Sequence, residues 1–110
     1  MTKKDEQLDQ LFFAICDPTR RKILDLLREA GELSVTDLAK AFEMSLNGVS
    51  KHVKILERAG VIRRTVNWRT HMISPSWERL NAGFEYLSTY HHFWNQRLDK
   101  FVEHLNKKGD

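Results

Sequence analysis

The chain has 110 residues, of which 41% are hydrophobic and 30% charged, and its formal net charge is +3 at pH 7. These values predict a single small domain, 1–110, and a charge balance that permits a nucleic-acid partner without indicating one alone. The single cysteine, Cys16, excludes an internal disulfide, so we expect a reducing, cytoplasmic location. The N-terminus has no signal-peptide pattern, and no apolar run reaches the roughly 20 residues that cross a bilayer, so no membrane association is expected.

Two helices are predicted before residue 31. Over 4–15, apolar residues recur every three or four positions, and this stripe consists of Leu8, Leu11, Phe12 and Ile15. The next helix begins at the sequence DPTRR, where Asp17 is the expected N-cap and Pro18 occupies the first helical position. Gly31 is expected to end this helix.

Residues 34–59 predict a helix-turn-helix. The first helix begins at Ser34, the expected N-cap, and Asp37 takes the third helical position, as in a capping box. After a tight turn, Ser45 is expected to cap a longer helix that ends at Gly60.

Residues 61–74 predict a two-stranded hairpin with Asn67 and Trp68 at its tip, because β-branched residues are frequent there and their character alternates. Residues 76–108 return to a helical pattern. A mainly α-helical chain in which a small β-hairpin follows a helix-turn-helix is predicted to adopt the winged helix-turn-helix fold. In this prediction, 34–59 form the helix-turn-helix and 61–74 the wing.

The helix predicted over 46–59 has two distinct faces. Its inward stripe consists of Leu46, Val49, Val53 and Leu56. The opposite face combines short polar side chains with cations, namely Asn47, Ser50, Lys51, Lys54 and Arg58. This combination is typical of helices that read the DNA major groove, because short polar groups reach base edges and cations engage phosphates. No acid occurs from 44 to 56, and the hairpin adds Arg63, Arg64 and Arg69. We therefore favour DNA binding over an ordinary solvated face.

The last predicted helix carries an apolar repeat of 3.5 residues. Its members are Leu80, Phe84, Leu87, His91, Trp94, Leu98, Phe101 and Leu105. Such a repeat predicts a helix packed along another helix. We expect a homodimer in which helices 1–16 and 76–108 of both subunits share a core, rather than packing within one domain only. His91, the polar member, is expected to form an interface hydrogen bond, and a pH-dependent interface is the alternative.

The chain resembles the ArsR-type family of bacterial winged-helix repressors over most of its length. The segment FFAICDPTRRKILDLL is similar to the family's leading segment, and ELSVTDLAKAFEMSLNGVSKHVKILERAGVIRR is similar to its helix-turn-helix core. The family's recurring positions are present as Ser45, Val49, Ser50, His52 and the stretch 56–62. The resemblance implies a homodimeric transcriptional repressor that binds a pseudo-palindromic double-stranded DNA operator, often in its own promoter.

The resemblance also implies roles for individual residues. Asn47, Ser50 and Lys51 would face bases, and phosphate would be held by Ser45, Lys54, Arg64 and Arg69. Three positions depart from the family pattern. Leu46 replaces a frequent Gln, and Gly48 either permits close approach to the duplex or has no role. The wing tip lacks the usual Gly-Arg, so Asn67 is expected to supply the left-handed turn, and Trp68 is expected to fold back on the domain rather than pack on sugar edges.

A metal-sensing role is not expected. Ser34 and Thr36 occupy the positions of the two thiolates in the family's metalloid site, and neutral hydroxyls cannot replace thiolates as soft-metal ligands. The last helix offers His91, His92, Asp99, Glu103 and His104, but their spacing does not match the family's second site. Cys16 is interpreted as a small buried hydrophobe rather than a redox sensor. We therefore expect no metal and no cofactor.

Enzymatic function is not expected, because the chain has no nucleophile–base motif, no paired catalytic carboxylates and no glycine-rich phosphate loop. Two alternatives to a simple repressor stay open. One is a protein-interaction module on a winged-helix scaffold. The other is a repressor controlled by a partner protein, by redox chemistry or by a small ligand.

Overall fold

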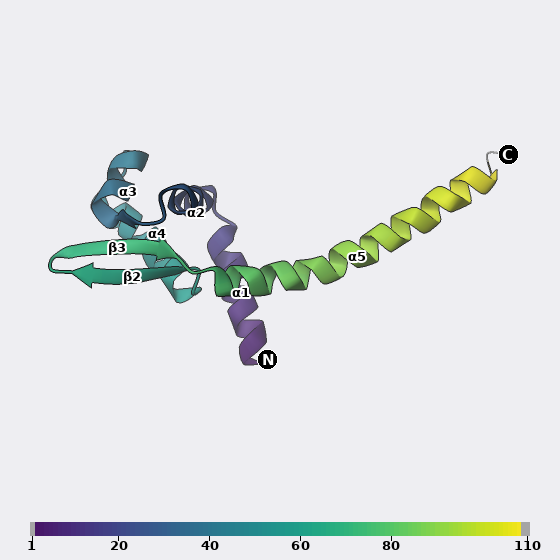
Figure 1. The fold of residues 1–110 in the computed structure, drawn as a ribbon, viewed down its shortest axis with the longest axis horizontal. Helices are drawn as coiled ribbons and strands as arrows, with labels where there is room; N and C mark the ends of the chain where they lie inside the picture. The colour runs from purple at the N-terminus through teal and green to yellow at the C-terminus, as the bar shows by residue number, and fades with distance from the viewer. Residues whose placement is uncertain (1, 109–110) are drawn as a thin grey trace.

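The computed structural model describes residues 2–108, except for the side chains of Trp94 and Lys108. In chain order the elements are α1 (Lys3–Ile15), α2 (Pro18–Ala30), β1 (Leu33–Ser34), α3 (Val35–Phe42), α4 (Leu46–Arg58), β2 (Ile62–Asn67), β3 (Thr70–Pro75) and α5 (Trp77–Lys108). The predicted winged helix-turn-helix fold is confirmed: residues 2–108 form five helices and a small antiparallel sheet (Figure 1).

The helix boundaries follow the predicted capping residues. Each N-cap side chain accepts a hydrogen bond from the backbone N–H three residues on: Asp17 from Arg20 at 3.1 Å, Ser34 from Asp37 at 3.0 Å, and Ser45 from Gly48 at 3.1 Å. Gly31 ends α2 at φ +83°, and its N–H donates to the carbonyl of Leu27. Local chemistry therefore accounts for the starts of α2, α3 and α4 and for the end of α2.

The sheet has three strands in the order β1–β3–β2, one more than the predicted hairpin. The additional strand, β1, has two residues, and it pairs Leu33 with Ile73 and Ser34 with Met72. A two-residue strand has no periodic pattern of its own, so only the pairing with β3 reveals it. β1 fastens the start of α3 to the base of the wing.

The core lies between α2, α3, α4 and the base of the sheet. Its fully buried side chains come from all four of these parts: Ile23, Leu27, Leu38, Val49, Val53, Leu56, Val61 and Ile73. Leu11 of α1 is also buried, at 3% exposure, and packs close to Gly83 of α5. The side of Gly83 that faces α1 has no room for a Cβ, so this glycine lets the two helices approach closely.

A buried arginine joins three helices. Arg20 of α2 is 6% exposed, and its Nε and Nη2 donate to the carbonyls of Ala14 at 2.6 Å and Phe13 at 3.0 Å, at the end of α1. Its Nη1 lies 3.3 Å from Nδ1 of His52 on α4. The same imidazole nitrogen is 4.0 Å from the carboxylate of Asp17. The hydrogen bond from the Arg20 backbone N–H, assisted by the charge of the Arg20 guanidinium, lowers the pKa of Asp17.

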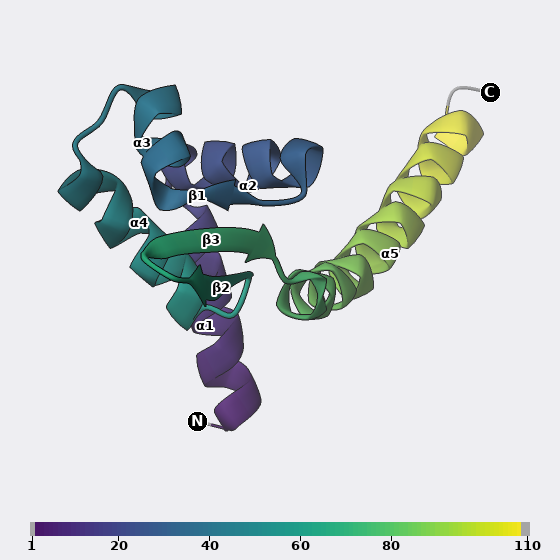
Figure 2. The ribbon, with the colours of Figure 1, turned by 60° about the vertical axis from the view of Figure 1, so that its left-hand side comes forward.

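Helix α5 leaves the body of the protein. Only its first part lies beside α1, and the remainder extends away from the other elements (Figures 1 and 2). The molecule therefore measures 70 × 33 × 21 Å. Within the described part of the chain, no helix is both long enough and apolar enough to cross a membrane.

The Arg20 contacts predict a large stability difference between two neighbouring arginines. Arg20→Leu removes the donors of two carbonyls at a buried site, so the free energy of unfolding should fall by about 2 kcal/mol. Arg21 also donates to an α1 carbonyl, that of Ile15 at 2.8 Å, but it is exposed. Arg21→Leu should therefore cost less than about 0.5 kcal/mol. Urea denaturation of both variants measures the difference, and equal losses would contradict the role given to Arg20.

Candidate nucleic-acid interface

Helix α4 presents a polar face to solvent. Asn47, Lys51, Lys54 and Arg58 are exposed and Ser50 is half-buried, whereas Val49, Val53 and Leu56 are completely buried. The predicted division into two faces is therefore confirmed at these positions. Leu46 is the exception: it was expected in the inward stripe but is 53% exposed. As the first helical residue it lies beyond the edge of the core, at the rim of a hollow described below.

A Cβ at residue 48 would make tight contacts in the first turn of α4. A Cβ at this position would lie 3.2 Å from Oγ of Ser45 and 3.3 Å from Cε of Met44. The cap itself does not require glycine, because Asp17 and Ser34 accept the same hydrogen bond from Arg20 and Asp37, which carry a Cβ. No acid lies in this first turn, so the partial positive charge of the helix N-terminus is not neutralised there.

The tip of the wing differs from the prediction by one residue. Asn67 pairs with Thr70 as the last ladder pair, and the connection is Trp68–Arg69. The residue with left-handed backbone is Trp68, at φ +61°, and not Asn67. The expectation that Trp68 folds back on the domain is wrong, because its side chain is 94% exposed. The strand register decides which residues form the turn, and sequence reasoning placed that register one residue too early.

Arg64 is held by two side chains of the protein. Its Nε and Nη2 donate to the two carboxylate oxygens of Glu57 on α4, both at 3.3 Å, and its Nη1 lies 3.1 Å from Nδ1 of His71 on β3. The side chain of Arg64 is 21% exposed and that of Glu57 is 38% exposed. Arg64 therefore connects the end of the helix to the wing in this conformation. Sequence reasoning missed Glu57, although it is the single acid between residues 44 and 77.

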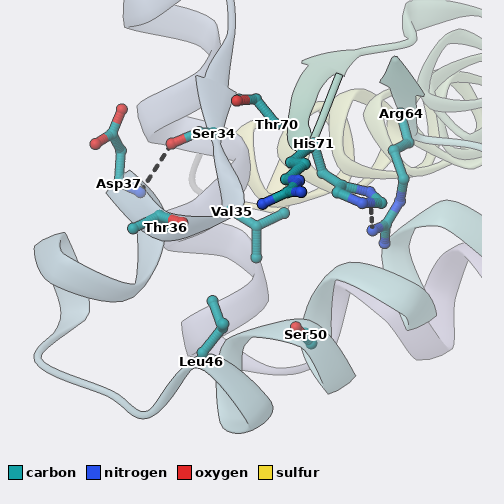
Figure 3. Close-up of a pocket in the computed structure, with 10 residues that line it drawn as sticks. Ser34, Val35, Thr36, Asp37, Leu46, Ser50, Arg64, Thr70 and His71 are labelled. Carbon is teal, nitrogen blue, oxygen red and sulfur yellow. Dashed lines mark hydrogen bonds between the residues drawn. The ribbon is translucent and has the colours of Figure 1, made fainter. Parts of the chain in front are cut away.

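An open hollow of about 470 Å³ separates the wing from the helix-turn-helix (Figure 3). It is bounded by the start of α3, by α4 and by the wing, and its lining consists of Ser34, Val35, Thr36, Asp37, Leu46, Ser50, Arg64, Arg69, Thr70 and His71. The wing cation Arg69 and the α4 hydroxyl of Ser50 thus belong to the same concave surface. Ser34 and Thr36 contribute neutral hydroxyl groups, not thiols, to this lining.

The candidate metal ligands considered in the sequence are not grouped in the described part of the chain. Among residues 2–108, no three His, Cys, Asp or Glu side chains are grouped so that they would hold a metal ion. Cys16 is exposed, which corrects its interpretation as a buried hydrophobe, and its Sγ lies 3.0 Å from the carbonyl oxygen of Phe13. It follows the last residue of α1, where the chain turns toward α2 and leaves the core.

The predicted dimer residues fall into two groups. On α5, Phe84, Leu87, Leu98 and Phe101 are between 51% and 69% exposed, and His91 is exposed with its Nε2 3.1 Å from Nδ2 of Asn95. On α1, Leu8, Phe12 and Ile15 are half-buried, whereas Leu11 belongs to the chain's own core. Trp94 lies outside the described side chains. Tyr86 adds an aromatic contact that was not predicted, with its ring 6.0 Å from that of Phe12.

Comparison with known proteins gives consistent results. Residues 15–65 match a family described as a helix-turn-helix domain. The transcriptional repressor SdpR of Bacillus subtilis is 47% identical over 55 residues, which is 50% of this chain and 60% of SdpR, so the chain spans about three fifths of the length of this relative. An HTH-type transcriptional regulator of Mycobacterium tuberculosis is 30% identical over 105 residues, covering 93% of this chain and 92% of the regulator. A crystal structure of an ArsR family transcriptional regulator superposes with a TM-score of 0.76 at 35% identity, over 86% of this chain and 97% of that one.

The contact between Glu57 and Arg64 predicts that the wing depends on the end of α4. Glu57→Gln removes the charge that holds Arg64, so the amides of β2 and β3 should exchange hydrogen roughly threefold faster, as a partly exposed ion pair is worth less than about 1 kcal/mol. Glu43→Gln removes one exposed acid elsewhere and is the matched control. Hydrogen exchange followed by mass spectrometry measures both. Unchanged wing protection in Glu57→Gln would show that the pair does not hold the wing.

Proposed function

Because this chain belongs to the ArsR-type family of winged helix-turn-helix transcriptional regulators, we propose that it is a cytoplasmic homodimeric repressor of a pseudo-palindromic DNA operator. The observation that carries the proposal is the exposed polar face of α4, which has no acid from 46 to 56, beside the basic wing. The single cysteine supports the cytoplasmic location.

Helix α4 is assigned to the major groove. That groove is about 12 Å wide and admits one helix, whose N-terminal residues then contact base edges. Asn47 offers an amide donor and acceptor, Ser50 a hydroxyl and Lys51 an ammonium group, and all three belong to the first half of α4. Gly48 lies between them and has no side chain to keep the backbone away from the duplex.

Phosphate contacts are assigned to the residues around this base-reading set. Lys54 lies one turn further along α4, and Arg69 lies at the wing tip, and both are exposed and free of acidic partners in the described structure. Ser45 and the first N–H groups of α4 offer donors at a positive helix end, which favours phosphate. Arg64 would have to break its hydrogen bonds to the Glu57 carboxylate before it could bind phosphate. We therefore assign Arg64 mainly the role of positioning the wing.

The exposed apolar face of α5 supports a homodimer. Within one chain, the apolar side chains Leu87, Leu98 and Phe101 of α5 are more than half exposed to solvent. Phe12 and Ile15 of α1 are only half-buried. A second copy of the chain has the same apolar face. In a two-fold symmetric dimer, α5 of one subunit would pack against α5 of the other. Such a dimer presents two α4 helices to successive major grooves, which requires a pseudo-palindromic operator with half-sites about one helical turn apart.

Release from DNA is assigned to a signal other than a thiolate-bound metal. Ser34 and Thr36 provide hydroxyls where thiolates would be needed, and the Ser34 oxygen already caps α3. The effector is then a partner protein, a small ligand or an oxidant. The alternative function, a protein-interaction module, predicts that no duplex is bound at all.

Two cation substitutions test the DNA-binding face. With a duplex enriched from a random pool by the wild-type protein, Lys51→Ala should weaken binding about tenfold, as loss of a base contact does. Arg69→Ala should reduce the dependence of log affinity on log salt by about 1, as loss of one phosphate contact does. Lys22→Ala removes an exposed cation from α2 and should change neither value. Fluorescence anisotropy across a salt series measures both quantities, and wild-type behaviour of Lys51→Ala and Arg69→Ala would exclude this face.

A second prediction concerns the dimer. Leu98→Asp places a carboxylate in the apolar repeat of α5 at a position that is 56% exposed in the single chain, so it should dissociate the dimer without unfolding the protomer. Gln96→Asp adds the same charge on another side of the helix and should leave the dimer intact. Sedimentation at micromolar concentration measures the mass. A monomeric wild-type protein, or a dimeric Leu98→Asp variant, would contradict the assigned interface.

A further inference from the structure

The wing tip places a large aromatic side chain in an unfavourable backbone conformation. Trp68 has φ +61°, a region that bulky residues rarely adopt, and a two-residue connection normally has Gly, Asn or Asp in such a position. Its indole is 94% exposed, so no described part of the protein compensates the strain or the exposed apolar surface. Strained conformations of this kind cluster at functional sites. The other described non-glycine residue with positive φ, Glu43 at +52°, is accounted for as the C-cap of α3.

The hairpin extends far enough to enter a groove of DNA. Strand β1 pairs only with Ile73 and Met72, so beyond Met72 the wing is a free two-stranded ribbon. The three to four residues from Met72 to the tip span about 10–13 Å at roughly 3.3 Å per residue. The minor groove is about 7.5 Å deep. Figure 1 shows the tip of the hairpin at the end of the molecule opposite the C-terminal end of α5.

The charge around Trp68 favours nucleic acid as the contacting molecule over protein. The wing contains Arg63, Arg64 and Arg69, and no acid occurs from 58 to 77. Arg69 follows Trp68 directly and lines the same hollow as Ser50 of α4. A duplex that receives α4 in its major groove therefore brings an adjacent minor groove toward the tip, and the negative potential of that groove attracts arginine.

We propose that Trp68 is a wedge that enters the minor groove beside each half-site, partly unstacks one base step and kinks the operator. Apolar wedges of this type kink duplexes by roughly 20–90°. Pyrimidine–purine steps unstack most easily, so Trp68 selects such a step at the flank without any hydrogen bond to a base edge. The inference rests on the proposed DNA-binding function and adds to it a residue that determines DNA shape and flank sequence.

The test uses full-length protein and a duplex enriched from a random pool by the wild type. Energy transfer between end-attached dyes reports the bend, and 2-aminopurine moved through the flanks reports unstacking. With wild type, the duplex should bend by roughly 20° or more, and 2-aminopurine fluorescence should rise at one step per half-site. Trp68→Gly should abolish both signals and weaken binding about tenfold, the loss expected for one aromatic–base stack. Trp68→Phe should retain most of both.

Two controls separate a wedge from a structural role. Trp68→Gly relieves the left-handed strain, so its melting temperature should equal or exceed that of wild type although the kink is lost. Trp77→Phe alters an exposed tryptophan at the start of α5 and should leave bend, unstacking and affinity unchanged. If Trp68→Gly still kinks the duplex, or if this variant loses the dimer, the wedge proposal is wrong. Either result leaves the proposed DNA-binding function standing. Failure of the wild type to enrich any duplex overturns both proposals.

Discussion

The geometry of this protein depends on the buried guanidinium of Arg20. It satisfies two carbonyls at the end of α1 and reaches the imidazole of His52 on α4, so one side chain connects the helix proposed for dimerisation with the helix proposed for DNA reading. A buried cation is costly unless its N–H groups find partners, and here each of the three guanidinium nitrogens has one. Because these partners belong to α1 and α4, a shift of either helix leaves part of the charge unsatisfied.

A second polar contact extends this arrangement to the wing. Arg64 connects Glu57, at the end of α4, with His71 on β3. The apolar core holds the base of the sheet through Ile73, and β1 fastens the same strand to the start of α3. Helix α4 and the wing are thus held by contacts at the end of α4 and at the base of the sheet, and the tip of the hairpin makes none of these contacts.

The helices were predictable from sequence because their limits follow from local chemistry. Caps at Asp17, Ser34 and Ser45 act within three residues, and the buried stripe of α4 repeats with the helical period. The remaining features depend on how separate helices and strands come together in the fold. Strand β1 exists only through its pairing with β3, the exposure of Trp68 follows from the hairpin register, and Arg64 is occupied because the fold brings Glu57 beside it. At the proposed interface, the sequence therefore predicted which types of residue are present, but it did not predict which of them contact one another.

The central claim is that a symmetric dimer places two copies of α4 in successive major grooves of one duplex. Hydroxyl-radical footprinting of the wild-type protein on an enriched duplex tests this most directly. Two protected patches with centres about 10 base pairs apart, related by two-fold symmetry, are the predicted result. A single asymmetric patch, or protection that does not depend on sequence, would contradict the account.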